Sequence, residues 1–104
     1  MSDKLVNQVK RKLNITWNDD DTNARVNDIM GGATSTLLHR LGIADPDFDF
    51  SVEGDENTLY LNYCLYERDH CLSEFFVNYA EMIASTRARH IVKQYEGTEG
   101  VTDE

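Results

Sequence analysis

Cys64, Glu67 and Cys71 are the residues of this chain whose types and spacing come closest to a metal site. Within a helix their three-to-four spacing would place them on one face, with His70 nearby, and thiolates bind zinc. The chain has no pair of cysteines at the two-residue spacing of structural zinc sites. The alternative, that both cysteines are reduced and buried packing residues of an aromatic-rich helix, is the one we favour. We therefore predict no metal and no cofactor.

A second possible metal site begins at Asp19. Together with Asp21 and Asn23 it matches the first three ligand positions of a calcium-binding loop. The match ends there, because the sixth position is Ala24 instead of glycine and the twelfth is Met30 instead of glutamate. These carboxylates are better explained as caps at the positive end of a helix that starts here.

Catalytic chemistry finds little support in the sequence. His39, His70 and His90 lie in three separate segments, and the chain contains neither a nucleophile elbow nor a phosphate-binding glycine loop. We therefore expect a protein without enzyme activity.

The stretch 57–77 predicts the helix around which the other elements are arranged. Leu59, Tyr63 and Tyr66 repeat on one face of it, and Tyr60 and Cys64 on a second, so the helix is apolar around most of its circumference. A chain of 104 residues has few other elements to cover such a helix. We expect the other helices to cover part of it and a second copy the rest, which predicts a homo-oligomer.

The remaining pattern predicts an all-α fold, a small bundle of about four helices. The first helix should begin at Ser2 or Asp3 and end near Leu13, before a connection whose Ile15 and Trp17 enter the core. The second should run from the acidic stretch 18–22 to a stop at Gly42. Gly31-Gly32 in its middle predicts a kink or a close helix crossing.

The second half of the chain is predicted to begin with a loop, 43–56. Phe48 and Phe50 should pin this loop to the core, and Asp55 or Asn57 should cap the central helix. A break is plausible after 69–70, followed by a last helix that reaches about 95 and ends at Gly97. The predicted domain is therefore 1–96, followed by a flexible acidic C-terminal tail, 97–104.

The charge excludes several classes of partner. Ten basic residues oppose 19 acidic ones, for a net charge of -9 and a pI near 4.6, which disfavours nucleic acid and anionic membranes. Nowhere do eighteen apolar residues run together, and the N-terminus lacks a secretory pattern, so we expect a soluble cytoplasmic protein without membrane contact. Two basic clusters, 10–12 and 87–93, either complement the negative ends of helices or pair with an acidic neighbour such as another copy.

The chain resembles the all-helical head-tail connector proteins of tailed bacteriophages, also called head completion proteins or portal adaptors. The resemblance covers nearly the whole chain and is carried by residues 5–17 (LVNQVKRKLNITW), 19–22 (DDDT), 25–29 (RVNDI), 61–68 (LNYCLYER) and 76–79 (FVNY). It implies a ring of about twelve copies at the virion neck, mounted on the portal protein after DNA packaging. The ring would extend the DNA channel, receive a stopper or tail-completion protein, and catalyse no reaction. Gly31-Gly32 departs from the family pattern.

For the contacts with other subunits or with the portal we predict aromatic and basic side chains. They are Tyr60, Tyr63, Tyr66, Arg68, Arg87, Arg89, Lys93 and Tyr95. An acidic ring would let DNA pass without binding it, and the C-terminal tail could become ordered on docking. Two other functions stay open: a small DNA-binding protein like the small subunit of a packaging terminase, and an acidic cytoplasmic regulator that inhibits a basic host protein by charge mimicry.

Overall fold

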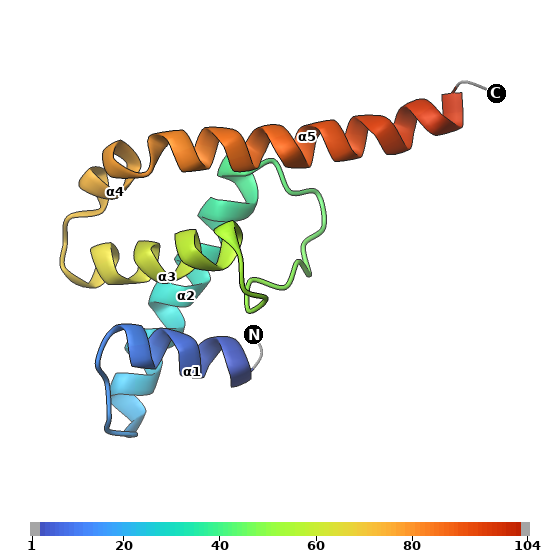
Figure 1. The fold of residues 1–104 in the computed structure, drawn as a ribbon. Helices are drawn as coiled ribbons and strands as arrows, with labels where there is room; N and C mark the ends of the chain where they lie inside the picture. The colour runs from blue at the N-terminus through green and yellow to red at the C-terminus, as the bar shows by residue number, and fades with distance from the viewer. Residues whose placement is uncertain (1–2, 103–104) are drawn as a thin grey trace.

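The computed structural model describes residues 3–102, and their side chains from 3 to 94. This part of the chain forms five α-helices and no strand, so the predicted all-α class is confirmed (Figure 1). The helices are α1 (Asp3–Lys12), α2 (Asp20–Arg40), α3 (Asp55–Arg68), α4 (Leu72–Asn78) and α5 (Ala80–Thr102).

Helix α3 is the central element, because the other four helices all pack against it. Helix α1 lies on one side of it and α4 and α5 on the other, whereas α2 crosses α3 and reaches α5 with its C-terminal end (Figure 1). The predicted stretch 57–77 is interrupted, as the break expected after 69–70 predicts. It breaks after Arg68, and the left-handed backbone of His70, at φ 60°, redirects the chain into α4.

The chain itself covers most of the apolar surface of α3. Leu59, Tyr60, Tyr63 and Cys64 are buried, whereas Leu61, Leu65 and Tyr66 are half-buried against the same core. Much of the burial that the sequence assigned to a second copy is therefore supplied within one folded chain. The core residues from the other segments include Val9, Met30, Leu37, Phe50 and Phe75.

Helix α2 begins and ends as its sequence predicts. The carboxylate of Asp19 accepts a hydrogen bond of 2.8 Å from the backbone N–H of Thr22, and Gly42 follows the last turn with φ 64°. The helix continues through Gly31 and Gly32. A Cβ atom at position 32 would lie 4.0 Å from the hydroxyl oxygen of Tyr63, so α2 passes α3 here at ordinary contact distance.

Two local predictions are wrong. Trp17 does not enter the core: it is 57% exposed, and its indole N–H donates to the hydroxyl of Thr22, 2.7 Å away. Ile15 alone packs against the core from this connection. Neither Asp55 nor Asn57 caps α3, which starts after Gly54 without a side-chain cap.

The loop between α2 and α3 is pinned as predicted. Phe50 is buried, and the edge of the Phe48 ring meets it at a centroid distance of 5.0 Å. The buried amide of Asn57 donates to the carbonyl oxygen of Phe50 and to the side-chain oxygen of Gln8 on α1. This amide explains why Asn57 is not a cap: it holds the loop instead.

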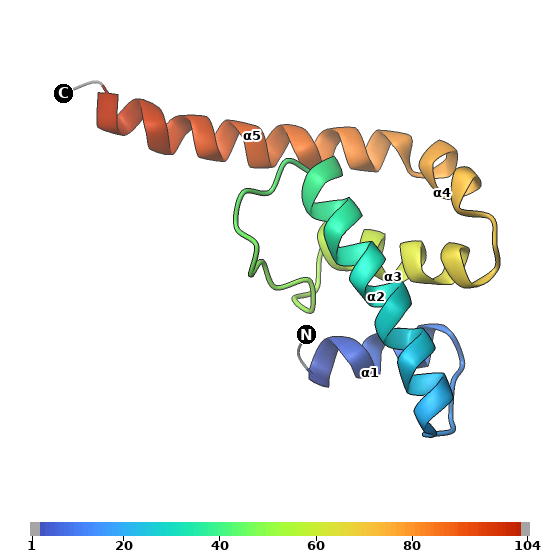
Figure 2. The same cartoon turned by 180° about the vertical axis from the view of Figure 1, so that it is seen from behind.

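Helix α5 extends beyond the rest of the molecule (Figures 1 and 2). Its 23 residues span about 34 Å at about 1.5 Å per residue, and the molecule measures 55 × 28 × 19 Å. The prediction that Gly97 ends the last helix is wrong, since α5 continues to Thr102. Of the predicted tail 97–104, residues 103 and 104 lie outside the described part of the chain.

Candidate docking surfaces

Two of the tyrosines predicted to meet another subunit lie in the core. Tyr60 and Tyr63 are buried within a single chain, so they do not lie at the surface where the sequence predicted an interface. The hydroxyl of Tyr60 donates to the carbonyl oxygen of Met30 at 2.9 Å and lies 2.8 Å from the hydroxyl of Thr34. Burial raises the pKa of Tyr60 to about 12.

The third tyrosine, Tyr66, is half-buried between α3 and α4. Its ring meets Phe75 and Tyr79 edge-on, at centroid distances of 5.8 and 6.0 Å, and its hydroxyl accepts a hydrogen bond from Asn78. Tyr66 therefore ties α3 to α4 and the start of α5. The side chain of Tyr95 lies outside the described residues.

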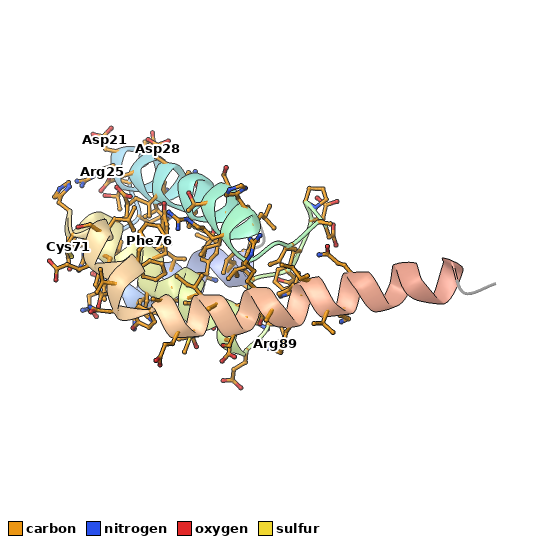
Figure 3. All side chains as sticks on the ribbon, turned by 90° about the horizontal axis from the view of Figure 1, so that it is seen from above. Asp21, Arg25, Asp28, Cys71, Phe76 and Arg89 are labelled. Carbon is orange, nitrogen blue, oxygen red and sulfur yellow. The ribbon has the colours of Figure 1, made fainter. Side chains whose placement is uncertain are left out.

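The two predicted interface arginines of α5 are bound within the chain. Arg87 donates to the carbonyl oxygens of His39 and Arg40 at the end of α2, at 3.3 and 3.2 Å. Arg89 pairs with Asp55 at the start of α3, at 3.1 Å (Figure 3). These bonds hold α5 on α2 and α3. Lys93 is exposed and has no ion pair among residues 3–94.

Exposed aliphatic side chains lie on α4 and α5, where Ala80 and Ala84 border a hollow beside His39 and Arg40 at the end of α2. Val77 at the end of α4 is 75% exposed, and Ile91 and Val92 on α5 are also exposed. At about 100° per residue, Ala80, Ala84, Ala88 and Ile91 fall on one side of α5. These four residues, with Val77 and Val92, are called the α5 stripe. Small side chains on an exposed helix allow another helix to approach closely, so the stripe is a candidate docking surface.

A second candidate surface is a cavity of about 230 Å³ where α1, α2 and α3 meet, here called the Trp17 pocket. Its lining consists of Leu13, Ile15, Trp17, Thr22, Arg25, Val26, Ile29 and Arg68. Arg68 is the one predicted interface residue that lies here, and it also donates to the carbonyl oxygen of Leu13. The sequence did not predict Trp17 or Arg25 as surface residues of a docking site. A tryptophan in an apolar connection is typical of a core residue.

The charges around the Trp17 pocket are arranged unevenly. Its lining contains two arginines and no carboxylate. Arg25 stands between Asp21 and Asp28 at the N-terminal end of α2 (Figure 3), yet it forms no ion pair among residues 3–94. Asp28 and Glu67 line an adjoining hollow together with Arg25, and Arg68 pairs with Asp69.

The cysteines do not form the metal site considered above. Within the described residues, no group of three or more histidine, cysteine, aspartate and glutamate side chains could hold a metal ion. Burial, with the nearby charge of Glu67, raises the pKa of Cys64 to about 12, so this thiol does not readily become a thiolate ligand. Cys71 lies outside α3, at the residue before α4.

No helix in the described part of the chain is both long and apolar enough to cross a bilayer. Comparisons of the chain with protein-family models, with curated proteins and with solved structures gave no match. The arrangement of the surfaces described above, together with the resemblance in the sequence, is therefore the basis for the function.

Proposed function

We propose that the protein is a structural component of a tailed bacteriophage, a head-tail connector that assembles into a ring on the portal vertex. The observation that carries this proposal is the α5 stripe, which is exposed on the part of α4 and α5 that is packed on a complete small core. A core that is filled by one chain needs no partner to fold, so exposed aliphatic side chains on its surface favour contact with another protein. The resemblance indicates which partners these are: another copy, the portal, and the stopper or tail-completion protein.

The charge of the chain supports a channel through which DNA passes. With -9 per chain, a ring of about twelve copies would carry on the order of a hundred negative charges. Such a ring repels the phosphate backbone and leaves DNA free to move. The ring would lie in the virion neck, after assembly in the host cytoplasm, and would have a structural and not a catalytic role.

The C-terminal segment is proposed to contact the portal. Residues 97–104 contain three acidic residues, Glu99, Asp103 and Glu104, and α5, which ends at Thr102, points away from the core. Removal of 98–104 should weaken binding to the portal and leave the domain folded, because the packed core ends well before this segment. Loss of helicity over the rest of the chain on truncation would contradict this.

The experiment that tests the function measures the mass of the assembly. Sedimentation and native mass spectrometry of the purified protein, with and without portal protein, should detect a ring of many copies, and negative-stain microscopy should show its central channel. A compact monomer under all these conditions would contradict the proposal.

The contribution of the α5 stripe is tested with Ala84→Glu and Ile91→Glu. Each places a carboxylate on the stripe and should reduce assembly or portal binding without lowering the thermal midpoint. Thr58→Glu is the matched control, since it adds the same charge at an exposed position on α3. Equal behaviour of all three variants would exclude the stripe as the docking surface.

The DNA-binding alternative has less support. A recognition helix needs unpaired basic side chains on one face, whereas Arg87 and Arg89 are bound to α2 and α3. Binding of duplex DNA at moderate salt would nevertheless favour it. The alternative of an acidic regulator would be favoured by a monomer that binds a basic host protein.

A further inference from the structure

The loop that joins α2 to α3 is an acidic surface with an apolar side chain at its centre. Residues 45–53, here called the acidic loop, carry four carboxylates: Asp45, Asp47, Asp49 and Glu53. None of the four forms an ion pair among residues 3–94. Val52 lies among them and is 59% exposed. An exposed aliphatic side chain in a segment with four carboxylates that form no ion pair fits a surface that is apolar at its centre and basic at its edge.

The acidic loop is held in place before any partner binds. Asp49 accepts hydrogen bonds from the backbone N–H and the hydroxyl of Ser51, and the carbonyl oxygen of Ser51 accepts one from Gln8 on α1. Phe50 is buried beside them. Val52 therefore follows a fixed segment, and little conformational entropy would be lost on docking.

The Trp17 pocket has the complementary character. Its volume of about 230 Å³ exceeds the 150 Å³ or so of an apolar cavity that admits benzene, so it has room for an aliphatic side chain. The stretches around it also carry acidic residues, among them Asp19, Asp28 and Asp69, and its basic side is formed by Lys10, Arg11 and Lys12 at the end of α1 with Arg25 and Arg68 of the lining. Of these, Arg11 and Lys12 are exposed in the last turn of α1, next to Leu13 of the pocket lining.

The two surfaces lie at opposite ends of α3. The acidic loop leads into the first turn of α3, and the pocket contains Arg68 from its last turn, about 20 Å away for 14 residues. Figures 1 and 2 show the loop and the α1–α2 connection on opposite sides of the body. Surfaces so placed cannot meet within one chain, and between copies they join head to tail, which closes into rings when the rotation allows.

We propose that the acidic loop of one copy docks on the Trp17 pocket of the next, with Val52 entering the pocket. The carboxylates of Asp47 and Glu53 then face Arg25 and Lys12 of the neighbour. This inference rests on the self-association in the proposed function and names the surfaces that produce it. It also explains why Trp17 and Val52, two large apolar residues, stay exposed in a chain whose core is otherwise complete.

The test uses two double charge reversals. Lys12→Glu with Arg25→Glu changes the pocket edge, and Asp47→Lys with Glu53→Lys changes the loop. Each double variant alone should raise the concentration needed for half-assembly by about tenfold or more. An equimolar mixture should assemble again, because intact loops meet intact pockets and reversed loops meet reversed pockets in alternation.

Two further measurements complete the test. Val52→Glu should abolish assembly, and the emission of the single tryptophan, Trp17, should move to shorter wavelength when the wild-type protein assembles. Glu74→Lys with Glu81→Lys is the matched control for the loop variant, with the same change of charge at exposed positions on α4 and α5. Thermal midpoints of the variants as monomers show that each is folded.

The outcomes separate this inference from the proposed function. The head-to-tail contact would be excluded if both reversed variants assemble as the wild-type protein does. It would also be excluded if the two variants do not assemble when mixed. Neither result would exclude the proposed ring. A wild-type protein that stays monomeric both alone and with portal would overturn the proposed function and this inference together.

Discussion

Glu56 on α3 and His90 on α5 are joined side chain to side chain, with Oε2 of the carboxylate 2.7 Å from Nε2 of the imidazole. Both side chains are largely buried, and the ring of Phe48 meets the imidazole edge-on at a centroid distance of 5.5 Å. The same carboxylate lies 3.6 Å from the guanidinium of Arg89. The pair fixes the middle of α5 to the start of α3, just before α5 leaves the body of the molecule.

The first prediction concerns stability at acidic pH. Burial raises the pKa of Glu56, but its backbone hydrogen bond, the hydrogen bond to His90 and the charge of Arg89 outweigh this and lower the pKa below 4.5. A lowered pKa means that the unfolded chain binds the proton more readily. The stabilisation is therefore present above about pH 4.5 and is lost as the pH falls below it.

Glu56→Gln should flatten this part of the pH dependence and cost about 1–2 kcal/mol near pH 7. Urea unfolding at about five pH values between roughly pH 3 and 7 would measure both the loss of stability and its pH dependence. Glu53→Gln is the control, since its exposed carboxylate has no ion pair among residues 3–94. An equal slope for both variants would contradict the role of the pair with His90.

The second prediction concerns the hydroxyl of Tyr60. Tyr60→Phe leaves the ring in place but removes the bonds to Met30 and Thr34 across the contact of α3 with α2, and should cost about 1–2 kcal/mol. Tyr66→Phe is the matched control. It removes a single solvent-exposed hydrogen bond from a half-buried side chain and should change the free energy of unfolding by less than about 0.5 kcal/mol. Similar values for the two would contradict a structural role of the buried hydroxyl.

The third prediction concerns the glycine pair in α2. No atom lies within 4 Å of a Cβ placed at Gly31, and the nearest at Gly32 is the Tyr63 hydroxyl at 4.0 Å, so an alanine fits at both positions. Each Gly→Ala change should raise the stability by up to about 1 kcal/mol, because glycine lowers helix propensity. Thermal unfolding of the single and double variants gives the result. A lower midpoint for Gly32→Ala alone would indicate that the crossing with α3 requires glycine.

The fourth prediction concerns stability at alkaline pH. The thiol of Cys64 ionises near pH 9.0 in the unfolded chain but has a pKa of about 12 when folded, because of burial. The unfolded chain therefore releases its proton first, and stability should fall as the pH rises above 9.0. Cys64→Ala should reduce the loss of unfolding free energy with rising pH, measured by denaturant unfolding between roughly pH 8 and 10. An unchanged slope would contradict the burial of this thiol.

The thiols should also differ in reactivity. Cys71 is half-exposed and should react with a disulfide reagent in the native protein, whereas the buried Cys64 should react at the rate of unfolding. Mass spectrometry of the labelled protein over time distinguishes one fast site from two. The Cys71→Ala variant is the control and should retain only the slow reaction.

Several features of the fold could be predicted from the sequence because they depend on short-range chemistry. The cap of α2 by Asp19, the stop at Gly42 and the pinning of the loop by Phe48 and Phe50 are confirmed. Each depends on groups within a few residues or on simple apolar periodicity. The central place of α3 follows in the same way, since a helix apolar on several faces has to be covered.

The errors arise where the choice of partner depends on the whole fold. Trp17 is a large apolar residue of a type that often lies in the core, but the crossing of α1, α2 and α3 leaves it at the edge of a pocket. The contacts of Arg87 and Arg89 within the chain were likewise not predicted, because only the packing of α5 brings them to the carbonyl groups and carboxylates of α2 and α3. Residue type sets what a side chain can bind, and only the arrangement of the helices decides which groups come within reach.

The sequence by itself thus determined the all-helical class, the central helix and the strong negative charge, because periodicity and charge do not depend on how the helices cross. The tertiary structure decided that one chain buries Tyr60 and Tyr63, and that α5 projects. It also placed the acidic loop and the Trp17 pocket at opposite ends of α3. These relations join residues far apart in the chain, and their distances are set by packing alone.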